Sequence, residues 1–400
     1  MKILVTDGEN RSALAVTRSL GKQGHSVQVV AARSKSLASS SRYCLRGIAV
    51  PDPQHNGAAF VSAICELSVK EKFDVIFPMT EQSIYLLNSV RDSLPKKTVL
   101  GCPPESMMQA VSDKSTLYHL AEDLHIPIPH TIYLTGIDDL NAAIRQIYSY
   151  PVVVKPALSK IPSNKGFLSA GVRYASNRHE LEQLFATSAV LRYPSLIQEK
   201  IVGPGTGLFT LYDRDRHLAL FSHKRLREKP PTGGVSVVSE SVSLDEEMVE
   251  ASDRLLSSVG WTGVAMVEFK RDQRDGKAKL MEINGRFWGS LQLAVNCGVD
   301  FPGLYLEYLH GKNPGTLVSD YRVACKLKWI LGTLDHLISQ LKKSTKELDP
   351  PQGHPSKMQA LLDFLRIWEK NTTYDVFDRM DIGPFAFEVK SYLRYILGKQ

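Results

Sequence analysis

The stretch "GVAMVEFKRDQRDGKAKLMEINGR", residues 263–286, places one glutamate near the end of each of two apolar runs. The segment "RDG" at 274–276 lies between the runs and predicts a tight turn joining two antiparallel strands. A carboxylate among apolar side chains costs several kcal/mol unless a base, a proton or a metal ion compensates it. Glu268 and Glu282 therefore call for a cation.

The register of this hairpin decides whether the two glutamates meet. The odd-numbered residues of both runs are apolar where they would pair, so burial against one core requires odd residues opposite odd ones. That register needs a loop with an odd number of residues, such as 274–276 with Gly276 in a left-handed conformation. It places Glu268 opposite Glu282, and Asn284 on the same face one pleat further on.

Two carboxylates and an amide oxygen form a site of hard oxygen ligands suited to Mg²⁺, which usually bridges to substrate phosphates. The alternative is that one glutamate forms an ordinary ion pair with Lys270 or Arg286 on a solvated face. Two further features favour a binding site. Met266 and Leu280 on the glutamate face could pack against a nucleotide base, and the planar guanidinium of Arg286 could donate two hydrogen bonds to a phosphoryl group.

Composition excludes several classes of protein. The 400 residues are 43% hydrophobic and 23% charged, as in an ordinary globular protein of two or three domains. The net charge of +7 is scattered between acids, which suits small anions and does not indicate nucleic-acid binding. Five cysteines without a C-x-x-C pair, a first segment too short for a signal peptide and the lack of long apolar runs predict a cytoplasmic protein with no stable membrane insertion.

The order of predicted elements divides the chain into four parts. Residues 1–105 alternate strands and helices and predict a doubly wound, Rossmann-like α/β domain, although the G-x-G-x-x-G fingerprint is missing. Residues 106–192 begin with a helix over 113–124, with Ser112 as the expected N-cap, and residues 193–315 bring longer strands. Residues 316–400 are expected to be mainly helical. One broad apolar face there predicts packing against the body or a second subunit, a possible homodimer, with a membrane-surface helix as the alternative.

A lysine in a buried strand is unusual because its ammonium must find an anion to stay charged. Lys155 in "PVVVKP" is such a residue, so it is either half of a structural ion pair or a phosphate ligand. The polar segment 159–171 that follows has the composition of a mobile flap whose backbone amides and Lys165 could fold over phosphates.

Five motifs follow one another along the chain: "SDKSTLYHLAEDLHIPIP", "VVVKP" before a flexible loop, the hinge "IQEKIVG", and the paired "VEFK" and "MEINGR". In this order they resemble the ATP-grasp superfamily, in particular its carboxylate-amine ligases, and are similar to the ATP-binding half of carbamoyl-phosphate-synthase large-subunit-like proteins. The resemblance spans about residues 1 to 315. It implies a pre-ATP-grasp domain, an α+β ATP-binding part in two subdomains, and ATP with Mg²⁺ or Mn²⁺ as cofactors.

The resemblance also implies roles for individual residues. Lys114 and Lys155 would contact the phosphates of ATP, with Lys165 and Gly166 in the covering loop. The hinge would read adenine largely through its backbone, at Glu199, Lys200 and Val202. Glu268, Glu282 and Asn284 match the metal ligands, and Arg286 lies near the transferred phosphoryl group. Many relatives have an acid for the ribose hydroxyls where this chain has Thr206, so the ribose contact stays unassigned.

Two further segments are candidates for substrate binding. "HKRLREKPPTGG" predicts a flexible basic loop that could bind a carboxylate through Arg225, Arg227 and the amides of Gly233 and Gly234, or else a solvated basic hairpin. Glu81 follows a parallel strand, where open α/β sheets place ligands, and either meets the amine or caps the next helix.

The expected activity is that of a ligase in which a small carboxylate attacks ATP to give an acylphosphate that an amine captures. Arg286, Lys155 and Arg225 would serve catalysis through positioning and electrostatics. A kinase-like phosphotransferase, a nucleotide-binding scaffold without turnover and a Rossmann oxidoreductase are the alternatives. The sequence names neither the carboxylate nor the amine.

Overall fold

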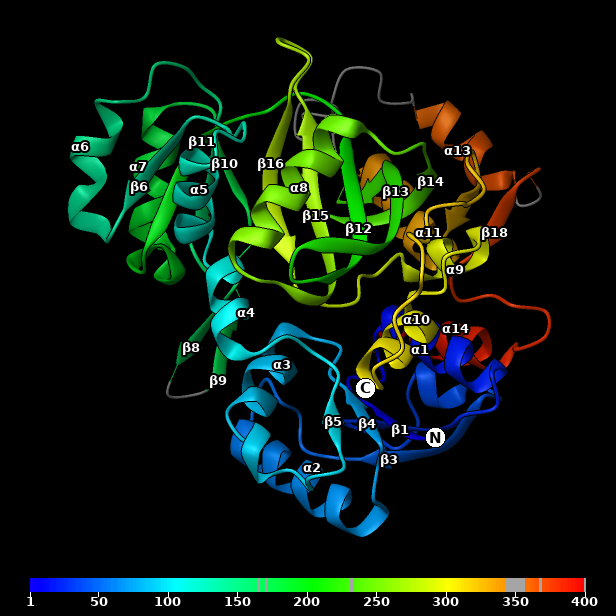
Figure 1. Ribbon diagram of the computed structural model, residues 1–400. Coiled ribbons are helices and arrows are strands. Elements are labelled where there is room, and N and C mark those ends of the chain that lie inside the picture. Colours follow the sequence, from blue (N-terminus) through cyan, green and yellow to red (C-terminus); the bar gives the residue numbers. More distant parts are fainter. Residues whose placement is uncertain (164–165, 170, 231–233, 343–356, 367–368, 399–400) are drawn as a thin grey trace.

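The computed structural model describes residues 1–400 except 164–165, 170, 231–233, 343–356, 367–368 and 399–400. Its first part is a parallel five-stranded sheet in the order β3-β2-β1-β4-β5, as expected for a doubly wound domain (Figure 1). The strands are β1 (Lys2–Val5), β2 (Ser26–Ala31), β3 (Cys44–Ala49), β4 (Val75–Phe77) and β5 (Val99–Leu100). The helices are α1 (Arg11–Lys22), α2 (Gly57–Glu71) and α3 (Glu81–Asn88).

Two helices lead out of this sheet into a smaller antiparallel one. They are α4 (Glu105–Ser112) and α5 (Lys114–Asp123). Ser112 ends α4, and Asp113 is the N-cap of α5 because its Oδ1 accepts from the Ser115 and Thr116 amides at 2.8 and 3.1 Å. The expectation that Ser112 caps this helix is therefore wrong, since the chain turns one residue later.

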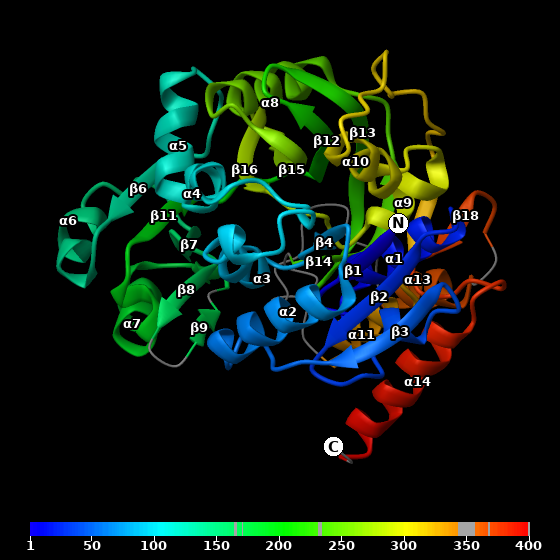
Figure 2. The same ribbon diagram turned by 60° about the horizontal axis from the view of Figure 1, so that its bottom comes forward.

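The smaller sheet has the order β10-β7-β11-β6, with a separate two-stranded hairpin beside it. Its strands are β6 (Thr131–Leu134), β7 (Val152–Pro156), β10 (Arg173–Ala175) and β11 (Ser195–Glu199), with helices α6 (Leu140–Ile144) and α7 (Arg178–Thr187). The hairpin consists of β8 (Lys160–Ser163) and β9 (Gly166–Ser169). In both views the hairpin lies beside the N-terminal sheet's helices (Figures 1 and 2).

The largest sheet has seven strands in the order β16-β15-β12-β13-β14-β17-β18. Five of them are β12 (Gly205–Asp213), β13 (Arg216–Lys229), β14 (Val235–Ser241), β15 (Thr262–Arg271) and β16 (Ala278–Asn284). The helices α8 (Glu246–Ser258), α9 (Leu291–Cys297) and α10 (Phe301–Leu309) pack on it.

The C-terminal extension supplies the other two strands of this sheet. β17 (Lys326–Lys328) pairs antiparallel with β14, and β18 (Thr372–Tyr374) pairs parallel with β17. The helices of the extension are α11 (Ile330–Lys342), α13 (Lys357–Leu365) and α14 (Gly383–Ile396). The extension is thus rich in helix, as expected, but it is also built into the central sheet.

Two apolar cores fix the large sheet against the N-terminal part. One joins α1 and β1 to α9, α10 and one face of the large sheet. The other joins α2, α3, α4, α5 and α8 to the opposite face. The cavity between the N-terminal sheet and the large sheet is therefore lined by elements held in place from both sides. None of the helices in the described part of the chain has the length and apolarity needed to cross a membrane.

Candidate ATP and metal site

The two glutamates of the hairpin lie opposite each other. In the ladder between β15 and β16, Glu268 pairs with Glu282 and Met266 pairs with Asn284. Glu268 is only 8% exposed. The predicted register at the carboxylates is confirmed, so both acidic side chains and the amide project from one face of the sheet.

The route to this register differs from the expected one. A β-bulge follows Glu282 in the ladder, because Phe269 pairs with Leu280 and leaves Met281 as the extra residue. The loop between Arg271 and Ala278 therefore holds an even number of residues, and the prediction of an odd loop is wrong. Gly276 does adopt the left-handed conformation, with φ of 71°.

The bulge also changes the face on which Leu280 lies. Leu280 is fully buried in the core that contains Val267 and Phe269, on the side of the sheet away from Glu268. The expectation that Leu280 shares the glutamate face is wrong, because it assumed an uninterrupted pleat. This orientation argues against contact between Leu280 and a nucleotide base.

Arg225 of β13 provides the positive charge next to Glu268. Its Nη2 donates to Glu268 Oε2, and its Nη1 donates to Glu228 Oε1 at 2.8 Å and to the Gly234 carbonyl at 3.4 Å. Burial raises the pKa of Glu268, and Arg225 only partly opposes this effect. Arg225 thus already compensates a carboxylate that a metal ion could also compensate.

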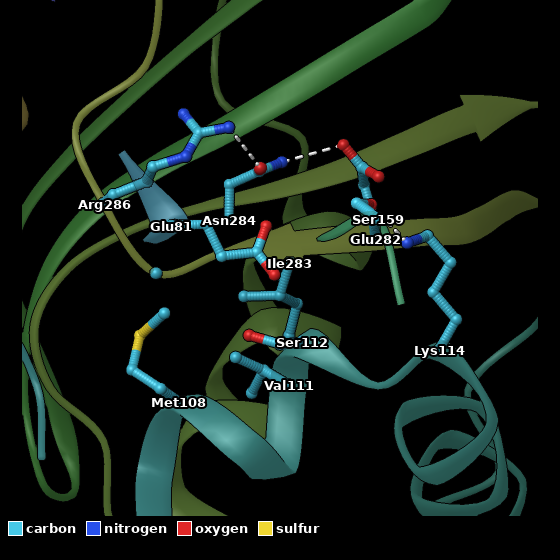
Figure 3. A pocket seen from close by; sticks show the side chains of 11 residues that line it. Glu81, Met108, Val111, Ser112, Lys114, Ser159, Glu282, Ile283, Asn284 and Arg286 are labelled. Carbon is cyan, nitrogen blue, oxygen red and sulfur yellow. Dashed lines mark hydrogen bonds between the residues drawn. The ribbon is translucent and has the colours of Figure 1, made fainter. Parts of the chain in front are cut away.

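A second chain of contacts holds the other carboxylate. Asn284 Nδ2 donates to Glu282 Oε1 at 2.8 Å, and Arg286 Nη2 donates to Asn284 Oδ1 at 2.9 Å (Figure 3). Burial alone would raise the pKa of Glu282, but Lys114, the Asn284 amide and Lys155 together lower it. Glu282 is therefore kept ionised, which suits a metal ligand.

The two lysines expected at the phosphates approach this site from different elements. Lys114 starts α5, and its Nζ donates to Ser159 Oγ at 2.7 Å, whereas Lys155 on β7 donates to the Tyr118 hydroxyl at 2.7 Å. They are 7% and 6% exposed. Burial lowers the pKa of Lys155 to about 8, against the opposing effect of Glu282 and Glu268. Within the described residues neither ammonium has a carboxylate oxygen within 4.0 Å, so both are available to an anion.

Tyr118 was missed in the sequence, and it connects Lys155 to the metal strand. Its hydroxyl accepts from Lys155 and donates at 2.6 Å to the carbonyl of Met281, the extra residue of the bulge. A tyrosine inside an amphipathic helix is typical of a core residue. In the sequence, only the neighbouring lysine could have indicated that it also belongs to the binding site.

The side chains of the two charged hinge residues already have partners in the structure. The Glu199 carboxylate accepts from the His130 amide at 3.0 Å, from Lys279 at 3.1 Å and from Arg274 at 2.7 Å. The Val202 carbonyl accepts from the Gln273 amide at 3.0 Å, and the Lys200 ammonium lies 5.7 Å from the Tyr174 ring centroid. A role of Glu199 in adenine binding would therefore have to use its main chain, as the resemblance to the ATP-grasp superfamily implies.

The covering hairpin contacts the N-terminal part. Gly166 has φ of 102°, and a Cβ at this position would lie 2.1 Å from the Gln54 carbonyl oxygen. The Phe167 ring packs edge-on against Tyr85 with 5.8 Å between centroids. Lys165 and Gly233, both expected at the site, lie outside the described residues.

The remaining candidates occupy strands or helix ends around the site. Thr206 lies on β12 and pairs with Lys224 and Phe269, and Arg227 pairs with Val238. Thr80 is the N-cap of α3, since its Oγ1 accepts from the Ser83 amide at 3.2 Å. Of the two interpretations of Glu81, capping is therefore wrong. Glu81 instead lines the pocket with Glu282 and Arg286, and burial raises its pKa against the effect of Arg286 and Lys114 (Figure 3).

A cavity of about 940 Å³ runs from Glu282, Asn284 and Arg286 to the carboxyl ends of β1, β2 and β4. Its lining also includes Trp329 and Glu388 of the C-terminal extension, which the sequence did not single out. Nothing near these two residues forms a local motif, so only the fold reveals them.

The donor set fits ATP with a divalent cation. Two facing carboxylates supply hard ligands, and the Asn284 oxygen, which accepts from Arg286 in this structure, would join them if the amide turned over. Two buried ammonium groups lack carboxylate partners within the described residues. Among those residues no group of three or more His, Cys, Asp or Glu side chains could hold a metal by itself. A bound Mg²⁺ would therefore complete its shell with phosphate oxygens and water, as it commonly does.

The chain is similar to several known proteins. Residues 221–330 match a family described as "ATP-grasp in the biosynthetic pathway with Ter operon". The chain is 24% identical over 191 residues to D-aspartate ligase of Enterococcus faecium, covering 45% of each protein. It is 24% identical over 245 residues to the carbamoyl phosphate synthase large chain of Methanobrevibacter smithii, covering 58% of this chain and 22% of that one.

The chain thus spans less than half the length of these curated relatives. Among solved structures, L-amino acid ligase from Bacillus licheniformis superimposes with a TM-score of 0.58 at 19% identity, covering 77% of this chain and 74% of that one. At this identity the likeness shows the fold. Residues 221–330 thus match an ATP-grasp family, and the chain as a whole shares its fold with a solved amino acid ligase.

Proposed function

We propose that this protein is an ATP-dependent ligase that joins a carboxylate to an amine through an acylphosphate, releasing ADP and phosphate. The observation that carries the proposal is the face-to-face pair Glu268 and Glu282, with Asn284 on the same face and two buried lysines whose charges act on Glu282. Of this set, Glu282 and Asn284 line the large cavity. D-aspartate ligase and L-amino acid ligase among the similar proteins support the same reaction class.

In the proposed reaction, a carboxylate oxygen attacks the γ-phosphorus of ATP, and the bond from that phosphorus to the ADP oxygen breaks. The amine nitrogen then attacks the carbonyl carbon of the acylphosphate, the carbon–oxygen bond to phosphate breaks, and the nitrogen loses a proton to solvent. Lys114 and Lys155 would hold the phosphates, and Arg286 would hold the transferred phosphoryl group.

Mg²⁺, or Mn²⁺, at Glu268, Glu282 and Asn284 would neutralise phosphate charge during transfer. The backbone of residues 199–202 would receive adenine, with Lys165 and Gly166 in the covering hairpin. Arg225, Arg227, Gly233 and Gly234 remain proposed carboxylate ligands, and Glu81 the proposed amine contact. To bind the substrate carboxylate, Arg225 would have to release Glu268, which would then be available to the metal ion.

The test is a screen of pooled carboxylates and amines for ADP release, followed by mass spectrometry of the products. An amide product supports ligation, whereas a phosphorylated product would assign the protein to the phosphotransferases. Glu282→Gln keeps the acceptor for the Asn284 amide but removes the charge, so ADP release should fall by about 100-fold or more. The matched control is Glu250→Gln on α8, an exposed glutamate that should leave the rate unchanged.

Two results would contradict the proposal. Stabilisation of the protein by NAD(P)H but not by Mg-ATP would favour an oxidoreductase. Mg-ATP binding without ADP release for any pool would favour a nucleotide-binding scaffold.

A further inference from the structure

The C-terminal extension is fixed against the N-terminal domain by buried ion pairs. Arg18 of α1 is 2% exposed, and its Nε donates to Asp381 Oδ2 at 2.8 Å while its Nη atoms donate to the carbonyls of Asp375 and Val376. Arg11 donates to the Asp375 carboxylate. In Figure 1, α14 lies beside α1, in agreement with these contacts. The wall that the extension adds to the large cavity is therefore a fixed part of the molecule.

Trp329, directly after β17, and Glu388 on α14 are the residues of the extension that line this cavity. The Trp329 Nε1 donates to Glu388 Oε1 at 2.7 Å. The other oxygen, Glu388 Oε2, is buried and has no hydrogen-bond partner among the described residues. A fixed donor thus orients a carboxylate that keeps one oxygen unused.

The charges around Glu388 do not balance. Arg11 is paired with Asp375, and Lys229, which also lines the cavity, is paired with Asp335. Among the described residues Glu388 has no basic atom within 4.0 Å. Burial raises the pKa of Glu388 to about 7; Asp375 and Asp335 add to this effect, whereas the Trp329 hydrogen bond and Arg11 oppose it. Among the described residues around Glu388, this wall therefore holds two basic and three acidic side chains.

The rest of the cavity shows where a substrate would lie. Arg286 and Lys160 line it together with Glu282 and belong to the proposed reaction end, whereas Glu9 and Asp52 add acidic groups on the loops of the N-terminal sheet. Apolar side chains also form part of the lining: Val30, Leu37, Val50, Phe60 and Met79. A volume of about 940 Å³ is at the upper end of the range for small-molecule sites.

We propose that Glu388, held by Trp329, binds a distal cationic group of the amine substrate, which would then be a diamine or a basic amino acid. The inference rests on the proposed function for which end of the substrate reacts. The binding of the distal cation by Glu388 does not depend on it. One nitrogen would reach the acylphosphate near Arg286, and the apolar stem would cross the apolar lining. The remaining positive group would complete the charge balance at the extension and use the free carboxylate oxygen.

The test compares matched pairs of free amino acids that differ in the distal charge. The full-length protein is titrated without nucleotide, and thermal stabilisation is measured with L-lysine against L-norleucine and with L-arginine against L-citrulline. Lysine or arginine should stabilise the wild type more than its neutral partner. In Glu388→Gln, which keeps an acceptor for the indole N–H, that difference should disappear. In Glu250→Gln it should persist.

Equal shifts within both pairs, no shift with any of the four, or a difference that survives in Glu388→Gln would each overturn the inference. Mg-ATP is titrated separately against the same three proteins. If the wild type does not bind Mg-ATP, the proposed function is contradicted. If it binds Mg-ATP but shows no preference for the charged amino acids, only the role of Glu388 is contradicted. Trp329→Phe, which keeps a ring but removes the donor, should weaken the preference without abolishing it.

Discussion

Replacing Tyr118 by phenylalanine should change how Mg-ATP binding depends on pH. The Tyr118 hydroxyl accepts from the Lys155 ammonium at 2.7 Å and is fully buried, so the variant removes a hydrogen bond from a charged group inside the protein. Burial already lowers the pKa of Lys155 to about 8. Without the hydroxyl, the charged form loses a partner and the pKa should fall further.

The size of the effect follows from the geometry. A hydrogen bond to a charged group contributes about 1.5–3 kcal/mol, which corresponds to roughly one to two pKa units at about 1.4 kcal/mol per unit. The pKa of Lys155 in the variant should therefore fall by roughly one to two units from that of the wild type. At pH 8 the lysine would be mostly neutral, and the dissociation constant of Mg-ATP should rise by about 10-fold or more.

Calorimetric titration with a non-hydrolysable Mg-ATP analogue between pH 6 and pH 9 measures this directly. In the wild type, affinity should fall as pH rises through about 8, because the ammonium loses its proton. In Tyr118→Phe the fall should begin one to two units lower, with affinity recovering towards pH 6. Lys155→Arg, which stays charged, should flatten the dependence.

The matched control is Tyr212→Phe. Tyr212 is also fully buried, and its hydroxyl donates to Asp253 Oδ1 at 2.8 Å, so it loses a comparable bond without touching Lys155. Its pH profile should match that of the wild type. An unshifted profile in Tyr118→Phe, or the same shift in Tyr212→Phe, would refute the assignment of Lys155 as a phosphate ligand oriented by Tyr118.

Three further predictions concern stability. Asp381→Asn leaves the Arg18 guanidinium buried without its carboxylate, so urea denaturation should show a loss of about 3–5 kcal/mol. Gly166→Ala meets the Gln54 carbonyl and should speed proteolysis of the covering hairpin, whereas Gly276→Ala, with open space around it, should cost only about 1 kcal/mol in the same urea assay. Burial raises the pKa of Glu388 to about 7, so its contribution to stability is present below the ordinary glutamate pKa and is lost as pH rises towards 7. Thermal unfolding should therefore show a free energy of unfolding for Glu388→Gln that is about 3 kcal/mol higher than that of the wild type at pH 8 and equal to it at pH 4.

The sequence was sufficient for the elements whose pattern is local. The N-terminal strands and helices alternate with clear periodicity, and Lys155 and the two hairpin glutamates stand out because charge inside an apolar strand is rare. The two strands of the C-terminal extension were not expected, because "KLK" and "TTY" are too short and too polar to stand out as strands. Glu388 lies more than 100 residues from Glu282 in sequence, and no spacing could have placed both beside one cavity.

The hairpin shows why a correct conclusion can follow from an incomplete premise. The parity argument assumed that every residue of β16 alternates between the two faces, and under that assumption only an odd loop could bring Glu268 opposite Glu282. The protein instead has an even loop and places one extra residue, Met281, directly after the last carboxylate pair towards the turn. Because the bulge lies on the turn side of Glu282, it corrects the register before the carboxylates are reached, and the site end of the ladder keeps the predicted pairing. The Met281 carbonyl accepts from Tyr118, which in turn holds Lys155. The residue that breaks the alternation thereby connects the strand of the metal ligands to the lysine expected at the phosphates, so deleting Met281 should disturb both at once.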